Sequence, residues 1–233
     1  MCGRYSLTSP EEAMRRLFDI QAGDIGPPRY NLAPSQLAPV ARRESADGPV
    51  LARLMRWGLV PGWARDESIG QRLINARSET AAEKPSFRAA FRQRRCLVPA
   101  DGFYEWRNLG SRKQPYWISR PEGEPFAMAG LWESWRRDDG PELLTFTILT
   151  TEATEDLRPI HHRMPVILPP EAHAAWLDQA ETPSAELFVS GRAPELRPRA
   201  VSTHVNRPAN DDAECLRPLD GEAPVAGTQP RLL

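Results

Sequence analysis

Hydrophobic and polar positions change their period several times along the 233-residue chain, and short strand-like runs outnumber helical ones. In a strand, alternate side chains share a face, whereas in a helix apolar residues recur at every third or fourth position. By this criterion the sequence predicts strands over residues 2–7, 37–42, 50–57, 71–78, 95–106, 115–119, 125–132, 143–150 and 164–168. Residues 22–36 are rich in glycine and proline, and we expect a loop there.

Helices are predicted at fewer places. The segment Ser9-Pro10-Glu11-Glu12 fits a capping box with proline at the first helical position. The apolar face of this first helix would consist of Met14, Leu17 and Phe18. Further helices are predicted over residues 84–93, 170–179 and 183–190.

The order of these elements limits the fold class. Strands do not alternate regularly with helices, which argues against a doubly wound parallel sheet. The pattern favours an α+β fold, namely a mixed, largely antiparallel, barrel-like β-sheet with a few covering helices. The length suits one domain, so we expect residues 1–220 to form a single domain and residues 221–233 to form a loose tail.

Composition limits the cellular compartment and the kinds of partner that the protein can have. No apolar run is long enough to span a bilayer, and no basic stretch precedes an apolar segment at the N-terminus, so we expect a cytoplasmic protein. Because the domain is expected to be self-contained, we expect a monomer. A net charge of −1 argues against coating nucleic acid by charge alone. Only Lys84 and Lys113 are lysines. The arginine excess suits bidentate contacts to phosphate, but a GC-rich genome explains it equally well.

The three cysteines, Cys2, Cys96 and Cys215, are spaced too widely for a disulfide framework or a zinc motif. We therefore expect neither a metal nor another cofactor. Cys96 lies in an apolar strand and is expected in the core. Cys215 lies in a polar stretch and carries no signal of its own.

Cys2 follows the initiator methionine, so removal of Met1 would make it the N-terminal residue. An α-amine has a pKa of about 7.7–8.0, so a useful fraction is neutral near pH 7. The thiol beside it is a second nucleophile. Together they can trap an aldehyde as a Schiff base and then as a five-membered thiazolidine. Taken alone, a cysteine at position 2 is more often an accident of sequence than a nucleophile.

Four segments pair a reactive group with an arginine two positions later. They are Cys2/Arg4, Asn75/Arg77, Glu105/Arg107 and His161/Arg163. Residues i and i+2 of a strand share a face, so neighbouring strands of this kind would form a polar floor edged with positive charge. Each member also has an ordinary explanation, such as a surface ion pair, a structural histidine or a turn asparagine. Trp63, at the end of the run 57–63, suits either a platform for bases or the core.

Six segments in this order resemble the SRAP family (SOS-response-associated peptidase), which processes abasic sites in DNA. They are Met1-Cys2-Gly3-Arg4-Tyr5, Arg29-Tyr30-Asn31-Leu32-Ala33-Pro34, Trp57-Gly58-Leu59-Val60-Pro61, Asn75-Ala76-Arg77-Ser78-Glu79-Thr80, Asp101-Gly102-Phe103-Tyr104-Glu105-Trp106 and Ile160-His161-His162-Arg163-Met164-Pro165. Together they span most of residues 1–220.

The resemblance implies a covalent thiazolidine cross-link from Cys2 to the opened abasic sugar in single-stranded DNA, which shields the lesion. It assigns amine positioning and deprotonation to Asn75 and Glu105, and ring opening to His161. Residues expected to contact DNA or line its site are Arg4, Asn31, Trp63, Arg77 and Arg163. The resemblance also implies a preference for 3′ junctions, lyase activity and self-processing of the first residue.

Two other functions fit parts of the sequence. A cysteine hydrolase would use Cys2 as nucleophile and His161 as base, and would need no DNA. A binding module would hold single strands with arginine and tryptophan without covalent chemistry. A heat-stable adduct on an abasic strand separates both from the cross-linking function.

Overall fold

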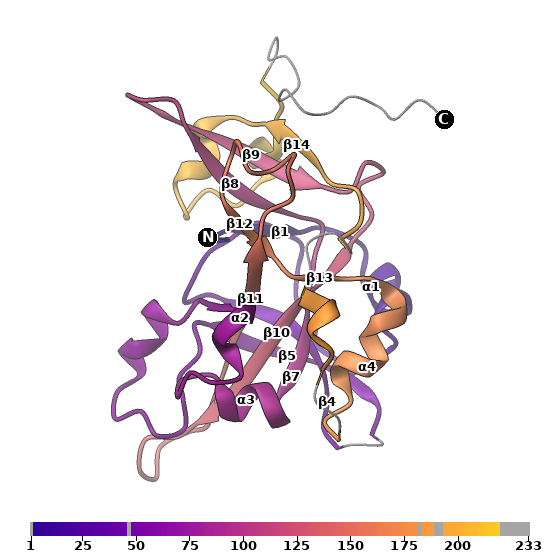
Figure 1. Ribbon diagram of the computed structural model, residues 1–233, viewed down its shortest axis with the longest axis vertical. Helices are drawn as coiled ribbons and strands as arrows, with labels where there is room; N and C mark the ends of the chain where they lie inside the picture. The colour runs from indigo at the N-terminus through magenta and orange to yellow at the C-terminus, as the bar shows by residue number, and fades with distance from the viewer. Residues whose placement is uncertain (1, 46–47, 181–182, 189–192, 220–233) are drawn as a thin grey trace.

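The computed structural model describes residues 2–45, 48–180, 183–188 and 193–219, which form two β-sheets and several short helices (Figure 1). The first sheet has the spatial order β14 (Arg197–Ala200), β9 (Lys113–Ser119), β8 (Gly102–Asn108), β1 (Tyr5–Leu7) and β3 (Arg29–Leu32). All of its strand pairs are antiparallel.

The second sheet is larger and mixed. Its spatial order is β12 (Arg163–Pro165), β11 (Leu143–Glu152), β10 (Phe126–Trp135), β7 (Arg95–Ala100), β4 (Leu37–Arg43), β5 (Val50–Trp57) and β2 (Ile20–Gly23). β13 (Ile167–Leu168) pairs with β10, and β6 (Asn75–Arg77) pairs with β11. Strand β11 is parallel to β5 and to β6, and β2 is parallel to β5. The α+β class with mostly antiparallel sheets is therefore confirmed.

The helices are short. They are α1 (Glu11–Leu17), α2 (Ser78–Ala81), α3 (Arg88–Gln93) and α4 (His173–Leu177), with 3₁₀ turns η1 (Glu67–Arg72), η2 (Pro170–Ala172), η3 (Ala185–Phe188), η5 (Thr203–Asn206) and η6 (Ala213–Leu216). Among the described residues, no helix is long and apolar enough to cross a membrane.

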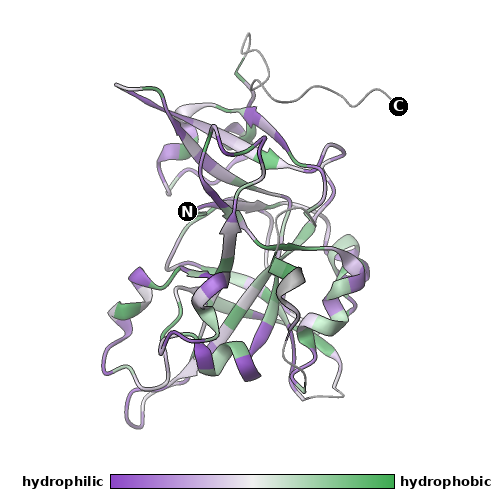
Figure 2. Ribbon diagram, viewed as in Figure 1, coloured by the Kyte–Doolittle hydropathy of each residue, from purple (hydrophilic) through white to green (hydrophobic). Residues whose placement is uncertain are grey.

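Aromatic packing joins the two sheets. The ring of Trp57 in β5 lies edge-on to Tyr5 of β1, with 5.2 Å between centroids, and stacks on Phe146 of β11 at 6.2 Å. The main cluster of buried apolar residues includes side chains from both sheets. Hydrophobic residues run along β10 and β13, whereas the far end of the β8–β9 hairpin is mostly hydrophilic (Figure 2). This shared core supports the expected single domain over residues 1–220, which stays a prediction, and residues 221–233 lie outside the described part.

Several predicted elements were misplaced. The loop expected over 22–36 contains the end of β2 and all of β3, because Arg29–Leu32 finds a partner in β1. The strand over 2–7 is reduced to β1. The strands over 95–106 and 164–168 are each two strands, and β14 was missed.

Other differences concern helices. The strand expected over 71–78 is η1, the short β6 and the start of α2. The helix over 84–93 begins only at Arg88, and that over 170–179 is η2 followed by α4. Within 183–190, residues 185–188 form a 3₁₀ turn, and residues 189–190 lie outside the described part.

The capping box at Ser9 is also wrong. Helix α1 begins after Pro10 with no side-chain cap, and the backbone N–H of Ser9 donates to Asp101 Oδ2 at 3.1 Å. Met14 and Phe18 are buried and Leu17 is partly buried, so the apolar face of the helix is as expected.

Candidate active site

The predicted reactive residues meet where the two sheets adjoin. Cys2 lies three residues before the start of β1, and Glu105 lies in the neighbouring strand β8. Strand β11 brings the other two together, because it pairs on one side with β6, which carries Asn75, and on the other with β12, which follows His161. Residues far apart in sequence are thus gathered by strand pairing.

Asn75 holds the segment at Cys2 directly. Its side-chain Nδ2 donates to the carbonyl oxygen of Cys2 at 2.7 Å. The other end of the amide, Oδ1, is buried and accepts no hydrogen bond from the described residues. A buried acceptor without a donor is unfavourable unless a ligand or a new group supplies one. This oxygen therefore keeps an unused acceptor position on the side chain that binds Cys2.

Glu105 and His161 form the second pair. The nearest carboxylate oxygen, Glu105 Oε1, lies 3.8 Å from His161 Nδ1. Burial raises the pKa of Glu105, which is 4% exposed, so its carboxyl accepts a proton more readily than an exposed one. Burial lowers the pKa of His161, and the backbone N–H of Arg163 donates to His161 Nδ1 at 3.0 Å. The same Nδ1 lies 3.1 Å from the carbonyl oxygen of Arg163, so the turn from His161 to Arg163 orients the ring in either tautomer.

Cys2 itself is fully buried in the full-length chain. Burial raises the pKa of its thiol, and the negative charge of Glu105 raises it further. The Sγ atom lies 3.7 Å from the carbonyl oxygen of Arg4. The thiol is therefore protonated at neutral pH, which is unlike the low-pKa thiolate of a typical cysteine hydrolase.

Arg4 and Asn31 do not lie on an open surface. They form hydrogen bonds with each other and with the segment after β14, and we call this set of contacts the brace. Arg4 Nη1 donates to Asn31 Oδ1 at 2.9 Å and to the carbonyl oxygen of Val205 at 2.8 Å. Asn31 is fully buried, and its Nδ2 donates to carbonyl oxygens of Val205, Arg207 and Asn210. These hydrogen bonds connect Arg4, just before β1, and Asn31, in β3, to the segment after β14. The sequence pattern did not predict this role for that segment.

Two other expected DNA contacts are exposed. Arg77 is exposed at the end of β6. Trp63 is 60% exposed, whereas Trp57 at the start of the same run is buried in the core. The indole N–H of Trp63 donates to the carbonyl oxygen of Pro85 at 3.4 Å. This tryptophan is held in place yet available to an incoming ligand.

Arg163 differs from these two because it is buried and paired. It is 8% exposed, and its guanidinium forms a bidentate ion pair with Glu79. The sequence places Glu79 within a motif but predicts no role for it, since only the fold brings it to Arg163.

Comparison with known proteins identifies the family of this chain. The sequence matches the family described as SOS response associated peptidase (SRAP) over residues 1–208. The chain belongs to the SRAP family. This confirms the resemblance drawn from the six motifs.

Relatives of this SRAP-family protein are similar over most of its length. The abasic site processing protein YoaM of Bacillus subtilis (strain 168) is 42% identical over 224 residues, which cover 93% of this chain and 97% of the relative. The abasic site processing protein HMCES of Gallus gallus is 37% identical over 224 residues, covering 83% of this chain and 67% of the relative. An X-ray structure of a Bacteroides thetaiotaomicron protein superimposes with a TM-score of 0.76 at 28% identity, covering 94% of this chain and all of that one.

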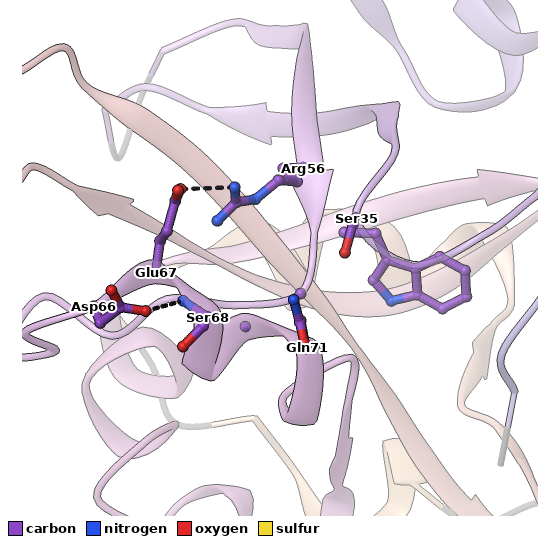
Figure 3. Close-up of a pocket in the computed structure, with 9 residues that line it drawn as sticks. Ser35, Arg56, Asp66, Glu67, Ser68 and Gln71 are labelled. Carbon is purple, nitrogen blue, oxygen red and sulfur yellow. Dashed lines mark hydrogen bonds and ion pairs between the residues drawn. The ribbon is translucent and has the colours of Figure 1, made fainter.

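The SRAP-family chain also has a polar cavity away from the predicted site residues. It encloses about 200 Å³. Figure 3 shows Arg56 paired with Glu67 across this cavity, and Asp66 accepting from the backbone of Ser68. Gly58 has a φ of +122°, and an added Cβ there would lie 2.6 Å from the carbonyl oxygen of Gly70. The glycine after Trp57 is therefore required by backbone packing in the wall of the cavity.

One group of side chains in the SRAP-family protein has metal-ligand composition. Potential ligand atoms of His204, Asp212 and Cys215 lie within 4.8 Å of one another. Both ring nitrogens of His204 already have partners, because Nε2 lies 3.1 Å from Asp212 Oδ2 and Nδ1 lies 3.2 Å from Asn210 Nδ2. We assign these contacts to holding η5 against η6, where Arg4 and Asn31 bind.

Proposed function

We propose that this protein captures abasic sites in single-stranded DNA by forming a thiazolidine with Cys2 after Met1 has been removed. The observation that carries the proposal is the side-chain amide of Asn75, which holds the Cys2 carbonyl at 2.7 Å and keeps a buried oxygen for the new amine. Family membership and the names of the relatives support the same substrate.

The two nucleophiles act in a fixed order. Burial keeps the thiol protonated, whereas an α-amine is partly neutral at pH 7. The amine therefore attacks the C1′ aldehyde of the opened sugar and forms a Schiff base with loss of water. The sulfur then attacks the imine carbon, and the thiol proton passes to the nitrogen. Ring closure balances without an oxidant or a metal.

Glu105 and His161 serve the proton transfers. The raised pKa of Glu105 allows its carboxylate to take a proton from the α-ammonium, which frees the amine to attack, and to return that proton to the departing hydroxyl, which leaves as water. His161, whose Nδ1 lies 3.8 Å from Glu105 Oε1, presents Nε2 to the sugar oxygen and assists ring opening through a hydrogen bond. Both groups then stand close to the reacting carbon.

The DNA strand is held outside this centre. The exposed Arg77 suits a backbone phosphate, and the exposed ring of Trp63 suits an unstacked base or the end of a duplex at a 3′ junction. Arg4 and Asn31 act through their brace, which fixes the backbone at Cys2. We infer that this monomer associates with the nucleoid when it binds DNA.

Lyase and peptidase activities follow from the same groups. A Schiff base that does not close to the thiazolidine allows elimination of the 3′ phosphate, which is the lyase reaction. Removal of Met1 is the self-processing expected of the family. Both belong to this proposal and rest on Cys2.

The direct test uses an oligonucleotide with one abasic site. Wild-type protein is expected to give a heat-stable species on a denaturing gel, whose intact mass shows loss of Met1 and of one water. Cys2→Ala should retain DNA binding but lose the stable adduct, whereas Cys96→Ala, a change of another buried thiol, should keep it. The proposal would be refuted if Cys2→Ala gave as much stable adduct as the wild type, or if wild-type protein lacking Met1 gave none. In the second case, peptide turnover without DNA would favour the hydrolase.

A further inference from the structure

The hairpin formed by β8 and β9 carries positive charge at the end that projects from the first sheet (Figure 1). Its turn is closed by the backbone, because the N–H of Leu109 donates to the carbonyl oxygen of Arg112 at 2.9 Å. Residues 108–113 are exposed, and this end of the hairpin is mostly hydrophilic (Figure 2). Residues 107–113, which we call the arm, therefore reach into solvent on a short ribbon with a tight turn.

The arm holds three cations that have no acidic partner. They are Arg107, Arg112 and Lys113, and residues 107–113 contain no aspartate or glutamate. None of the three side chains forms an ion pair or a hydrogen bond with another residue in the described part of the chain. On the second sheet, by contrast, the exposed Arg53 is matched by Glu44 at 2.7 Å. Unmatched like charges repel one another, so an anion that binds the arm would relieve this repulsion.

Strand β8 connects the candidate active site directly to the arm. Glu105 and Arg107 are two residues apart in this strand, so their side chains share a face and lie about 7 Å apart along it. In β9, Gln114 is opposite Arg107, and Lys113 and Arg112 lie one and two residues nearer the tip. These two residues are therefore about 10 and 13 Å from Glu105 along the hairpin. Because a stacked strand rises about 3.4 Å per nucleotide, the three cations lie about two to four nucleotides from a sugar bound at Glu105.

We propose that the arm binds backbone phosphates of the DNA strand on one side of the lesion, about two to four nucleotides away from it. The inference deepens the proposed function and rests on it for this register. Arg107, on the face of Glu105, contacts the phosphate nearest the lesion, and Arg112 and Lys113 contact the phosphates beyond it. The continuity of β8 with the site favours DNA over an acidic protein surface, because any strand held at Glu105 carries phosphates at these distances.

The salt dependence of binding to an undamaged single strand measures the number of phosphate contacts. Each contact contributes about 0.7 to the slope of log affinity against log salt concentration. The double variant Arg112→Gln/Lys113→Gln should therefore reduce the slope by about 1.4, and further addition of Arg107→Gln should bring the reduction to about 2.1. For the double variant, the wild-type advantage in affinity should grow about 25-fold between 1 M and 0.1 M salt. Fluorescence anisotropy of a labelled strand measures these affinities.

The matched control is Arg16→Gln/Arg53→Gln, which removes the same charge from two exposed arginines elsewhere. Helix α1, which carries Arg16, packs on β2, and β5, which carries Arg53, pairs with it, at the edge of the second sheet opposite β12. This control should keep the wild-type slope. A wild-type slope in the arm double variant would overturn the proposal and leave the arm to an acidic protein surface. An equal reduction in the control would also overturn it, because the effect would then come from net charge alone.

Thermal unfolding identifies folded protein, and the single variants Arg112→Gln and Lys113→Gln, each expected to reduce the slope by about 0.7, decide the question if the double variant does not fold.

A second experiment tests the register. The strand carries a tetrahydrofuran analogue of the abasic sugar, which has no aldehyde, and neutral methylphosphonates replace its phosphates one at a time. Wild-type protein should lose affinity when a phosphate two to four nucleotides to one side is neutralised, by about fivefold per contact at 0.1 M salt. The arm double variant should lose little at the positions that Arg112 and Lys113 contact. Equal losses there in the variant and the wild type would refute the register.

Both experiments measure binding without an adduct, so they stand apart from the test of cross-linking. A reduced salt slope in the arm variants would support the arm even if wild-type protein formed no thiazolidine. A stable adduct from wild-type protein, together with unchanged slopes in the arm variants, would refute the arm and leave the cross-linking function intact.

Discussion

Replacing Asn75 with aspartate tests the central contact with almost no change in shape. The wild-type amide donates through Nδ2 to the Cys2 carbonyl at 2.7 Å. A carboxylate has only acceptor oxygens, so Asn75→Asp would set an oxygen against an oxygen at this distance. It would also place a negative charge beside the residue that carries the amine.

The size of the effect can be worked out from this contact. Loss of the hydrogen bond removes about 1 kcal/mol, and leaving the buried carbonyl without a donor adds about 1–3 kcal/mol. We therefore expect Asn75→Asp to lower the free energy of unfolding by about 2–4 kcal/mol. The added charge favours the protonated, non-nucleophilic amine, so the rate of adduct formation at pH 7 should fall at least about tenfold.

Urea unfolding and a time course of heat-stable adduct measure the two effects separately. Asn108→Asp is the matched control, because Asn108 is exposed and its Oδ1 accepts from the backbone of Gly110 at 3.0 Å, which a carboxylate does equally well. That variant should remain within about 0.5 kcal/mol of wild type. If Asn75→Asp matched the control in both stability and rate, our account of the Cys2 segment would be refuted.

Three further predictions follow from burial and exposure. Glu105→Gln should raise the melting temperature at pH 7–8 while slowing adduct formation, because it removes a buried carboxylate whose pKa is raised. This gain in melting temperature should vanish below about pH 4.5, where the unfolded carboxyl is also protonated. An unchanged melting temperature at pH 7–8 would contradict the prediction. The pKa of His161 is lowered, so the unfolded chain binds this proton more readily. Stability should therefore decline as pH falls below about 6.5, less so in His161→Gln, as urea titrations at several pH values would show. Trp63→Ala should weaken binding of an undamaged single strand by about 1–3 kcal/mol in fluorescence anisotropy, with unchanged melting, whereas equal affinity would exclude a stacking role.

The strand pattern predicted the fold class because a strand that buries one face keeps alternating apolar and polar positions. It failed at residues 22–36, where glycine and proline indicated a loop. Arg29–Leu32 nevertheless forms a strand, because β1 offers a pairing edge and Asp211 accepts the backbone N–H groups of Tyr30 and Asn31. Neither partner is visible in a local window of sequence.

The capping motif failed for a related reason. The pattern at Ser9 is locally sound, but Asp101, between β7 and β8, accepts the N–H of Ser9 and the hydroxyl of Thr8. A carboxylate from a distant segment thus binds the donor that local reasoning gave to the capping box. Tertiary contacts overrode local preference at both places.

The candidate site was predictable in composition but not in arrangement. The i, i+2 argument holds for Asn75 and Arg77 in β6, and for Glu105 in β8, because these residues lie in real strands. It does not describe Arg4 and Arg163, whose side chains turn inward to partners far away in sequence. Spacing alone cannot distinguish an arginine that faces a ligand from one already paired.

The groups gathered at this site carry physical costs that are typical of a reactive centre. Asn75 keeps a buried oxygen without a donor, Glu105 keeps a carboxyl in surroundings that disfavour its charge, and Cys2 keeps a thiol that cannot easily ionise. A sequence selected only for stability would remove the first two groups, since an unsatisfied buried acceptor and a buried carboxyl each lower the stability of the folded state. Their concentration at one junction, stabilised by the aromatic core around Trp57, is expected where a strained arrangement serves a reaction. An amine created at residue 2 would offer a donor to Asn75 Oδ1, so removal of Met1 would both activate the site and relieve the cost at Asn75.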